Sequence, residues 1–176
     1  MLFYDIFRWS GLDRENALQA WYLFSFFLNF GAAVLVLRKY SSKPLAVATG
    51  AFFFTFGLPV LAQEGHVQLA YRFCIPLACD ALWQFSQQPR IKQLALLTFW
   101  LTWQFFLSIY LGYFLFLLLF VAGIGLPLTK TFSLSGILRY WPKRLQQAWR
   151  STQIRSNILY LFFIGGLFLA LFLLFQ

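Results

Sequence analysis

Charge is scarce in this sequence of 176 residues, because only 11% of them are Asp, Glu, Lys or Arg. A typical soluble domain carries about 25% of these residues. Hydrophobic residues make up 61% of the chain, and a soluble core of this size could not bury so much apolar surface. The composition therefore excludes an ordinary soluble domain. It predicts an all-α membrane protein, a polytopic bundle of transmembrane helices.

Groups that carry enzyme or metal chemistry are also few, with five acidic residues, two cysteines and one histidine. So few ligands give no support to a zinc site. Cys74 and Cys79 fall on different faces of one predicted helix, so we expect free thiols rather than a disulfide. The sequence has no nucleophile elbow, phosphate-binding loop or HExxH motif, which are the signatures of common soluble enzymes.

Basic residues are the one plentiful kind of charge, and they give a net charge of +9. They lie in short segments between apolar runs, which is how membrane topology is encoded. We therefore expect a lipid bilayer as the partner of this chain and no nucleic acid.

Long runs without charge define the predicted spans. Residues 93–128 contain no charged residue and would form a single helix of about 54 Å, far more than the roughly 30 Å of hydrocarbon in a bilayer. A break at 108–112, which combines a glycine with tyrosines typical of a membrane interface, would divide this run into two spans. The alternative is one long helix that projects from the membrane. Six spans are predicted, at residues 17–37, 44–62, 67–88, 93–108, 112–128 and 157–175.

Basic segments set the predicted orientation. With six spans, residues 38–43, 89–92 and 129–156 lie on one side of the membrane, and the positive-inside rule assigns that side to the cytoplasm. Both termini and the turns at 63–66 and 108–112 then face outward. The predicted location is the bacterial inner (plasma) membrane.

Four parts of the chain follow from this pattern. They are an outward amphipathic segment (1–16), a five-span bundle (17–128), a cytoplasmic basic segment (129–156) and a C-terminal transmembrane helix (157–176). The basic segment carries six Lys or Arg residues and no acid, and its apolar residues recur at helical spacing. This pattern is typical of a helix that lies on an anionic membrane surface or docks to a protein partner. Its membrane-surface residues are Lys143, Arg144 and Arg150.

Ionisable residues gather in only one part of the hydrophobic body, between Pro59 and Asp80. The members of this cluster are Glu64, His66, Arg72 and Asp80. An ionisable side chain at membrane depth is costly, and its presence therefore favours a functional site. By contrast, Asp13 and Glu15 are interpreted as acids of a helix start.

Each member of the cluster has a functional and a structural interpretation. Glu64, in the predicted outward turn, would act as a base or hold a divalent cation, and His66 would hydrogen-bond a phosphate; alternatively, both belong to a polar interfacial turn. Arg72 would lie about 9 Å past His66 along a helix, where it could clamp a lipid phosphate with two hydrogen bonds or simply extend to the interface. Asp80 lies deeper, so structural hydrogen bonding is the favoured role.

A family resemblance covers Gly11 to Leu128. Three segments resemble the central part of bacterial multi-pass membrane glycosyltransferases of the GT-C class, including YfhO-like proteins. They are GLDRENALQAWYLFSFFLNFGAAVLVLRKY, AVATGAFFFTFGLPVLAQEGHVQLAYRFCIPLACDALWQF and PRIKQLALLTFWLTWQFFLSIYLGYFLFLLL. Members combine a span ending in a basic dipeptide, a Gln-x-Gly-His-like turn, a helix with an internal Pro-Leu, and a Pro-Arg break.

The resemblance implies sugar transfer from a polyprenyl-phosphate donor on the outer side of the membrane. It also implies a chain truncated at both ends relative to the family, which is either a piece of a larger enzyme or a short relative without the main catalytic acid. Asp5 would then be a remnant acid, and Glu64 the other candidate for catalysis. Whether the chain is an enzyme stays open at this point. The second alternative is a non-enzymatic membrane scaffold or assembly subunit. The third is a transporter component, which only Asp80 and Pro76 support.

Overall fold

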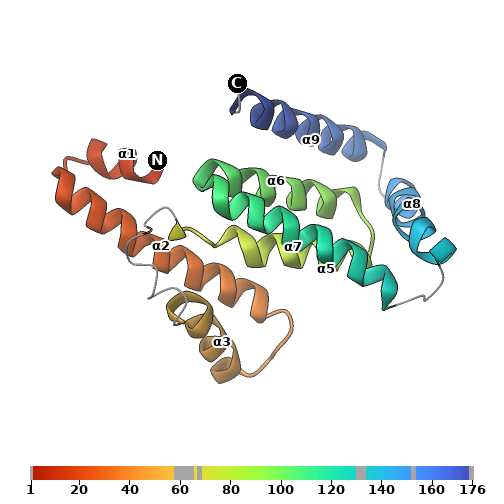
Figure 1. Ribbon diagram of the computed structural model, residues 1–176, viewed down its shortest axis with the longest axis horizontal. Coiled ribbons are helices and arrows are strands. Elements are labelled where there is room, and N and C mark those ends of the chain that lie inside the picture. The colour runs from red at the N-terminus through yellow and green to blue at the C-terminus, as the bar shows by residue number, and fades with distance from the viewer. Residues whose placement is uncertain (1, 58–65, 67–68, 130–133, 152–153, 175–176) are drawn as a thin grey trace. The chain divides into compact units, whose positions relative to one another are not determined.

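The computed structural model describes residues 2–57, 66, 69–129, 134–151 and 154–174. This described part of the chain contains eight α-helices and no strand, which confirms the all-α class (Figure 1). The helices belong to two compact units, Met1–Pro76 and Leu77–Gln176.

A helical hairpin forms most of the first unit. Helix α2 (Arg14–Leu37) begins where the Asp13 carboxylate accepts a hydrogen bond from the backbone N–H of Asn16 at 2.7 Å, so the predicted helix-start role of Asp13 is confirmed. Helix α3 (Pro44–Phe56) begins with a proline, whose missing N–H is not needed in a first turn. The two helices pack against each other, and Phe56 stacks on Phe26 with 5.2 Å between ring centroids.

The short helix α1 (Leu2–Trp9) packs on the N-terminal half of α2. Phe3 and Phe7 both meet the ring of Phe24, with centroids 5.5 and 5.8 Å apart. These edge-on contacts between aromatic rings fix the short helix against the longer one.

A second hairpin lies at the centre of the second unit. Helix α5 (Cys74–Gln87) leads into this unit, and helices α6 (Ile91–Leu107) and α7 (Ile109–Leu128) follow it. Ser108 alone separates α6 from α7, in an extended conformation with φ −159° and ψ 117°. Gly112 makes this tight turn possible, since a Cβ atom there would lie 2.9 Å from the Cα of Phe105. The predicted break at 108–112 is confirmed.

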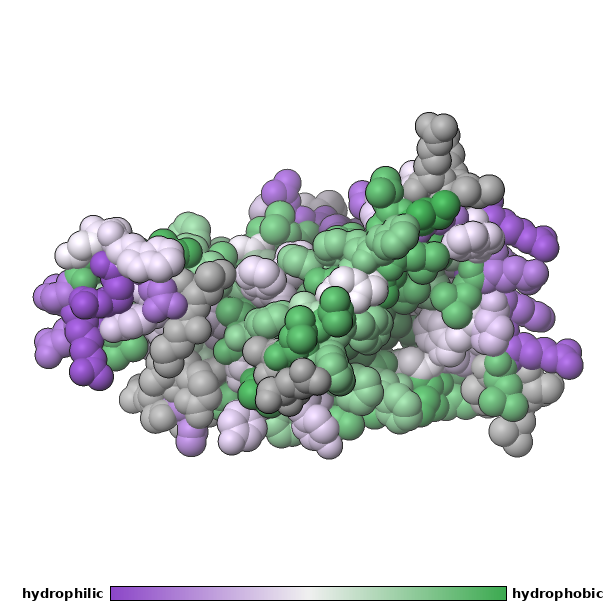
Figure 2. All heavy atoms as spheres, turned by 90° about the horizontal axis from the view of Figure 1, so that it is seen from above, coloured by the Kyte–Doolittle hydropathy of each residue, from purple (hydrophilic) through white to green (hydrophobic). Residues whose placement is uncertain are grey.

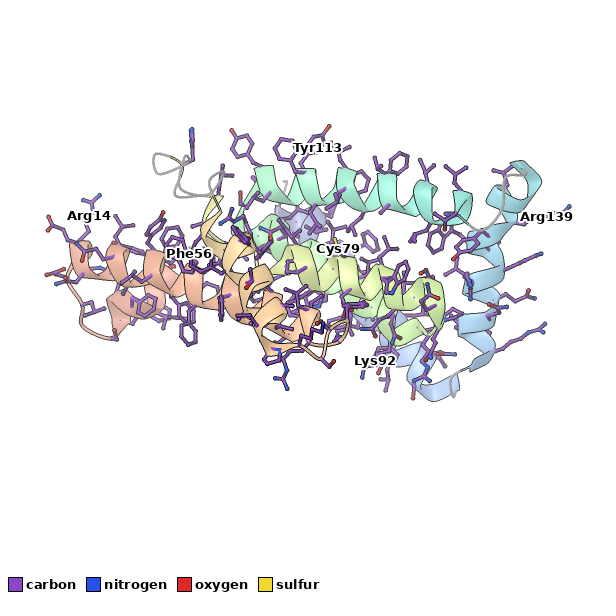
Figure 3. All side chains as sticks on the ribbon, turned by 90° about the horizontal axis from the view of Figure 1, so that it is seen from below. Arg14, Phe56, Cys79, Lys92, Tyr113 and Arg139 are labelled. Carbon is purple, nitrogen blue, oxygen red and sulfur yellow. The ribbon has the colours of Figure 1, made fainter. Side chains whose placement is uncertain are left out.

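Two further helices complete the second unit. Helix α9 (Ile154–Leu174) packs on α6, and helix α8 (Leu134–Ser151) contacts α6 and α7 near their ends. In Figure 3, α8 runs crosswise to α7. A hydrophobic cluster of Phe85, Ile91 and Ala148 joins α5, α6 and α8.

A proline explains how α8 attaches to α7. Pro127 lies inside α7 and has no N–H to donate to the carbonyl of Gly123, four residues earlier. The indole Nε1–H of Trp141 on α8 donates to that carbonyl at 2.8 Å. The hydrogen bond that the proline removes from one helix is thus supplied by another.

Three described helices are long and apolar enough to cross a membrane. They cover Arg14–Leu37, Ile109–Leu128 and Ser156–Leu173, which correspond to the first, fifth and last predicted spans. Large apolar side chains on them are exposed, such as Phe27 at 78% and Phe162 at 76%. Figure 2 shows the resulting hydrophobic surface. Such surface is unfavourable in water and favourable in lipid, so the fold supports a multi-pass membrane protein.

The remaining predicted spans are short helices where the structure describes them. Helices α3, α5 and α6 have 13, 14 and 17 residues, or about 20 to 26 Å at 1.5 Å per residue. Residues 58–62 of the predicted second span lie outside the described residues. The count of six spans therefore stays a prediction.

The helix predicted from residue 67 begins later than expected. Residues 70–72 are not helical, and α5 starts at Cys74, so Pro76 lies in the first turn of the helix rather than in its middle. A proline there removes no helical hydrogen bond. The segment before it is not helical, and the side chain of Asn29 on α2 bonds its backbone at Ala70 and Arg72.

Candidate lipid-phosphate site

One buried amide on α2 holds the non-helical segment 70–72. The side chain of Asn29 donates from Nδ2 to the carbonyl of Ala70 at 2.7 Å and accepts from the backbone N–H of Arg72 at 2.9 Å. Asn29 is 0% exposed. Backbone groups inside an apolar unit need partners, and one amide supplies both a donor and an acceptor. Asn29 thus fixes the backbone on both sides of Tyr71.

Tyr71 fixes the same segment from the other direction. Its hydroxyl donates to the carbonyl of Trp21 at 2.7 Å, and its ring stacks on Phe3 with centroids 5.3 Å apart. The ring also meets the indole of Trp21 at 5.0 Å. The backbone that carries Arg72 is therefore anchored to both α1 and α2.

The guanidinium of Arg72 has an unused edge. Its Nε and Nη2 atoms are buried and make no hydrogen bond within the described part of the chain. These two nitrogens form the side-on fork with which arginine grips a carboxylate or phosphate through two parallel hydrogen bonds. Tyr22 on α2 interacts electrostatically with the guanidinium. A buried donor without an acceptor is costly, so this edge favours an anionic ligand.

The structure does not place His66 and Arg72 on one helix. The sequence placed them about 9 Å apart along one helix, but Leu69 lies in a short 3-10 turn and residues 70–72 are not helical. His66 is exposed, and its carbonyl accepts from the N–H of Leu69 at 2.9 Å. The predicted helical spacing is therefore wrong.

Of the three predicted acids, the structure describes Asp5 and Asp80. Glu64 lies outside the described residues, so its roles as a base or metal ligand stay predictions. Asp5 is exposed on α1. Asp80 on α5 is 7% exposed, and its Oδ2 accepts from Nε2 of Gln84 at 2.7 Å. This is the geometry of a structural hydrogen bond within one helix.

Metal ligands do not cluster in the described part of the chain. No group of three or more His, Cys, Asp or Glu side chains there could hold a metal ion. Cys74 is buried and Cys79 half-buried, both as free thiols. The described residues therefore provide no group of ligands that could bind a divalent cation together with Glu64.

Comparison with known proteins adds no relative. No family model, curated protein or solved structure matches the chain. The likeness to GT-C glycosyltransferases therefore rests on the sequence segments alone.

The sequence did not single out Asn29 and Tyr22, the partners that the structure gives Arg72. Asn29 carried a usable signal, because a polar amide within the charge-free run 17–37 needs a partner at membrane depth. Tyr22 carried none, since a tyrosine near a helix end is typical of any membrane interface.

Proposed function

We propose that this chain is a polytopic membrane protein that binds the phosphate of a membrane lipid through Arg72. The observation that carries the proposal is the buried Nε and Nη2 edge of its guanidinium, which has no hydrogen-bond partner among the described residues. A phosphate oxygen pair would complete both hydrogen bonds and neutralise the charge. The segment that presents this edge is already ordered by Asn29 and Tyr71, so little entropy would be lost on binding.

The surroundings of Arg72 favour a lipid over a soluble anion. At 1.5 Å per residue, Tyr22 lies about 12 Å and Asn29 about 22 Å along α2 from its first residue, Arg14. The guanidinium thus interacts with the N-terminal half of a helix that could span the bilayer. The charge pattern assigns this half to the outer leaflet. A phosphate with an apolar tail would meet both the guanidinium and the exposed apolar surface beside it.

A polyprenyl-phosphate sugar donor is the finer form of this proposal, and the resemblance over Gly11 to Leu128 supports it. In glycosyl transfer, the bond between the anomeric carbon and the phosphate oxygen breaks, and a new bond forms to the acceptor oxygen. Arg72 would stabilise the departing phosphate. A carboxylate, for which Glu64 is the candidate, would take the proton of the acceptor hydroxyl.

Lipid-phosphate binding by Arg72 variants tests the proposal. The full chain in nanodiscs is titrated with a short-chain polyprenyl phosphate, with the unphosphorylated polyprenol as the ligand control. We expect Arg72→Ala to weaken binding about tenfold to a hundredfold, since a charge-assisted pair is worth about 1.5–3 kcal/mol. Arg72→Lys should recover part of the affinity, because lysine supplies charge without the fork.

Lys43→Ala provides the matched control, as it removes an exposed basic residue between α2 and α3 of the same unit. Its affinity should equal that of the unchanged protein. Equal affinity of Arg72→Ala and the unchanged protein would contradict the proposal.

A non-enzymatic scaffold is the second candidate function, and the basic helix α8 favours it. In that case, replacing Lys143, Arg144 and Arg150 abolishes function in cells, whereas Glu64→Ala and His66→Ala are tolerated. The opposite pattern favours the lipid-phosphate enzyme.

A further inference from the structure

Helix α8 is attached to its unit through one face. Ala148 is fully buried in the cluster with Phe85 and Ile91. Trp141 stacks on Phe85 with centroids 6.1 Å apart and donates to the carbonyl of Gly123. These contacts come from α5, α6 and α7, so they fix how α8 is rotated about its own axis.

A stripe of large apolar side chains on α8 remains exposed. Leu138, Leu145 and Trp149 are 72%, 44% and 44% exposed. At about 100° per residue, these three lie within roughly 40° of one another, and about 70° around the helix from Trp141 and Ala148. The exposed apolar stripe is thus a neighbour of the buried face and not part of it.

A basic stripe lies farther around the same helix. Arg139, Lys143 and Arg150 are exposed and lie within about 40° of one another, roughly 120° from the apolar stripe and nearly opposite the buried face. Figure 3 shows Arg139 pointing away from α8. Arg144 lies apart from this stripe, over the ring of Tyr140 at 5.3 Å from its centroid. The described residues of α8 include no acid to oppose these charges.

Helix α8 lies where the apolar helices of its unit end. It follows the C-terminus of α7 and precedes α9, and both of these helices could span a membrane. It also contacts α6, whose start carries the exposed residues Arg90 and Lys92. Hydrophilic side chains gather at this edge in Figure 2. The end of a spanning helix lies at the level of the lipid headgroups.

We propose that α8, together with Arg90 and Lys92, forms a binding surface for anionic lipid headgroups. The apolar stripe would enter the acyl boundary beside the bundle, and the basic stripe would face the phosphates. A soluble polyanion would pair with the basic stripe but would leave Leu138, Leu145 and Trp149 in water. The two stripes together therefore favour lipid as the occupant. This surface is independent of the Arg72 site.

Anionic-lipid affinity of the full chain tests this surface. The protein is released from nanodiscs that mix phosphatidylcholine and phosphatidylglycerol, and bound lipids are counted by native mass spectrometry. The triple variant Arg139→Gln, Lys143→Gln, Arg150→Gln should bind phosphatidylglycerol at least about tenfold more weakly, because each basic residue contributes about fivefold at low salt. The charge-preserving triple variant Arg139→Lys, Lys143→Arg, Arg150→Lys should bind as the unchanged protein does.

Insertion of the apolar stripe has its own readout. Lipids brominated on the acyl chain should quench Trp149, and the difference between the unchanged protein and Trp149→Phe isolates that signal from the other tryptophans. Unchanged phosphatidylglycerol affinity in the glutamine variant would overturn the proposal. A second set of results would also overturn the proposal: Trp149 is not quenched, the protein binds heparin, and it shows no preference for phosphatidylglycerol. These results together would assign the surface to a soluble polyanion.

Discussion

At the scale of single residues, Asn29 is the side chain on which the candidate site depends most. It is fully buried and bonds both Ala70 and Arg72. Asn29→Leu keeps the number and branching of the side-chain heavy atoms, but a buried carbonyl and a buried N–H lose their partners. Each unsatisfied group costs about 1–3 kcal/mol, so we expect the free energy of unfolding to fall by about 2–5 kcal/mol. Denaturation of the purified protein in mixed micelles measures this change.

Gln19→Leu is the matched control, because Gln19 is exposed on the same helix. This variant should change the free energy of unfolding by no more than about 0.5 kcal/mol. If Asn29→Leu is equally mild, the two hydrogen bonds do not hold the segment. The orientation of Arg72 would then need another explanation.

At the scale of elements, the contact between α7 and α8 depends on a proline in one helix and a tryptophan in the other. Pro127 leaves the carbonyl of Gly123 without its helical donor, and Trp141 supplies one at 2.8 Å. Trp141→Phe keeps an aromatic ring but removes the N–H, and we expect a loss of about 1–3 kcal/mol of stability. Pro127→Ala restores a backbone N–H that can reach Gly123.

A double-mutant cycle separates this hydrogen bond from general packing. Trp141→Phe should cost less in the Pro127→Ala background than in the unchanged protein, because the carbonyl then has a helical donor. An equal cost in both backgrounds would show that Trp141 acts through packing alone. Proteolysis of α8 in membranes provides a second readout, since a detached helix is cleaved faster.

The sequence predicted well the helices whose ends are marked by charged residues and the break that a run too long for one span requires. Helix α2 follows Asp13 and ends before Arg38, and the break at Ser108 follows from the excess length of the run 93–128. Helix α5 was predicted too long because its start depends on Asn29, more than forty positions earlier in the chain. The sequence next to the start of α5 contains no sign of such a contact, although a polar amide in the run 17–37 indicated that Asn29 needs some partner. For the same reason, Arg72 was predicted as a candidate, but not the residues that position it.

At the scale of the whole molecule, the distribution of basic residues predicts which side of the membrane each end of the helices faces. In the second unit, Arg90 and Lys92 begin α6, and α8 with its basic stripe contacts the same helix. Two basic segments separated in sequence thus share one end of the unit, as the positive-inside rule requires of cytoplasmic segments. His66, in the first unit, belongs to the turn that the same rule assigns to the outside.

Cysteine labelling in intact cells tests this assignment. In a background with Cys74→Ala and Cys79→Ala, single cysteines replace His66 and Gln147, both of which are exposed. A membrane-impermeant maleimide should label the cysteine at 66 in intact cells, and the cysteine at 147 only after permeabilisation. The reverse pattern would place α8 outside. Arg72 would then face the cytoplasmic leaflet, and an outward-facing sugar donor could not reach it, although its phosphate-binding edge would be unchanged.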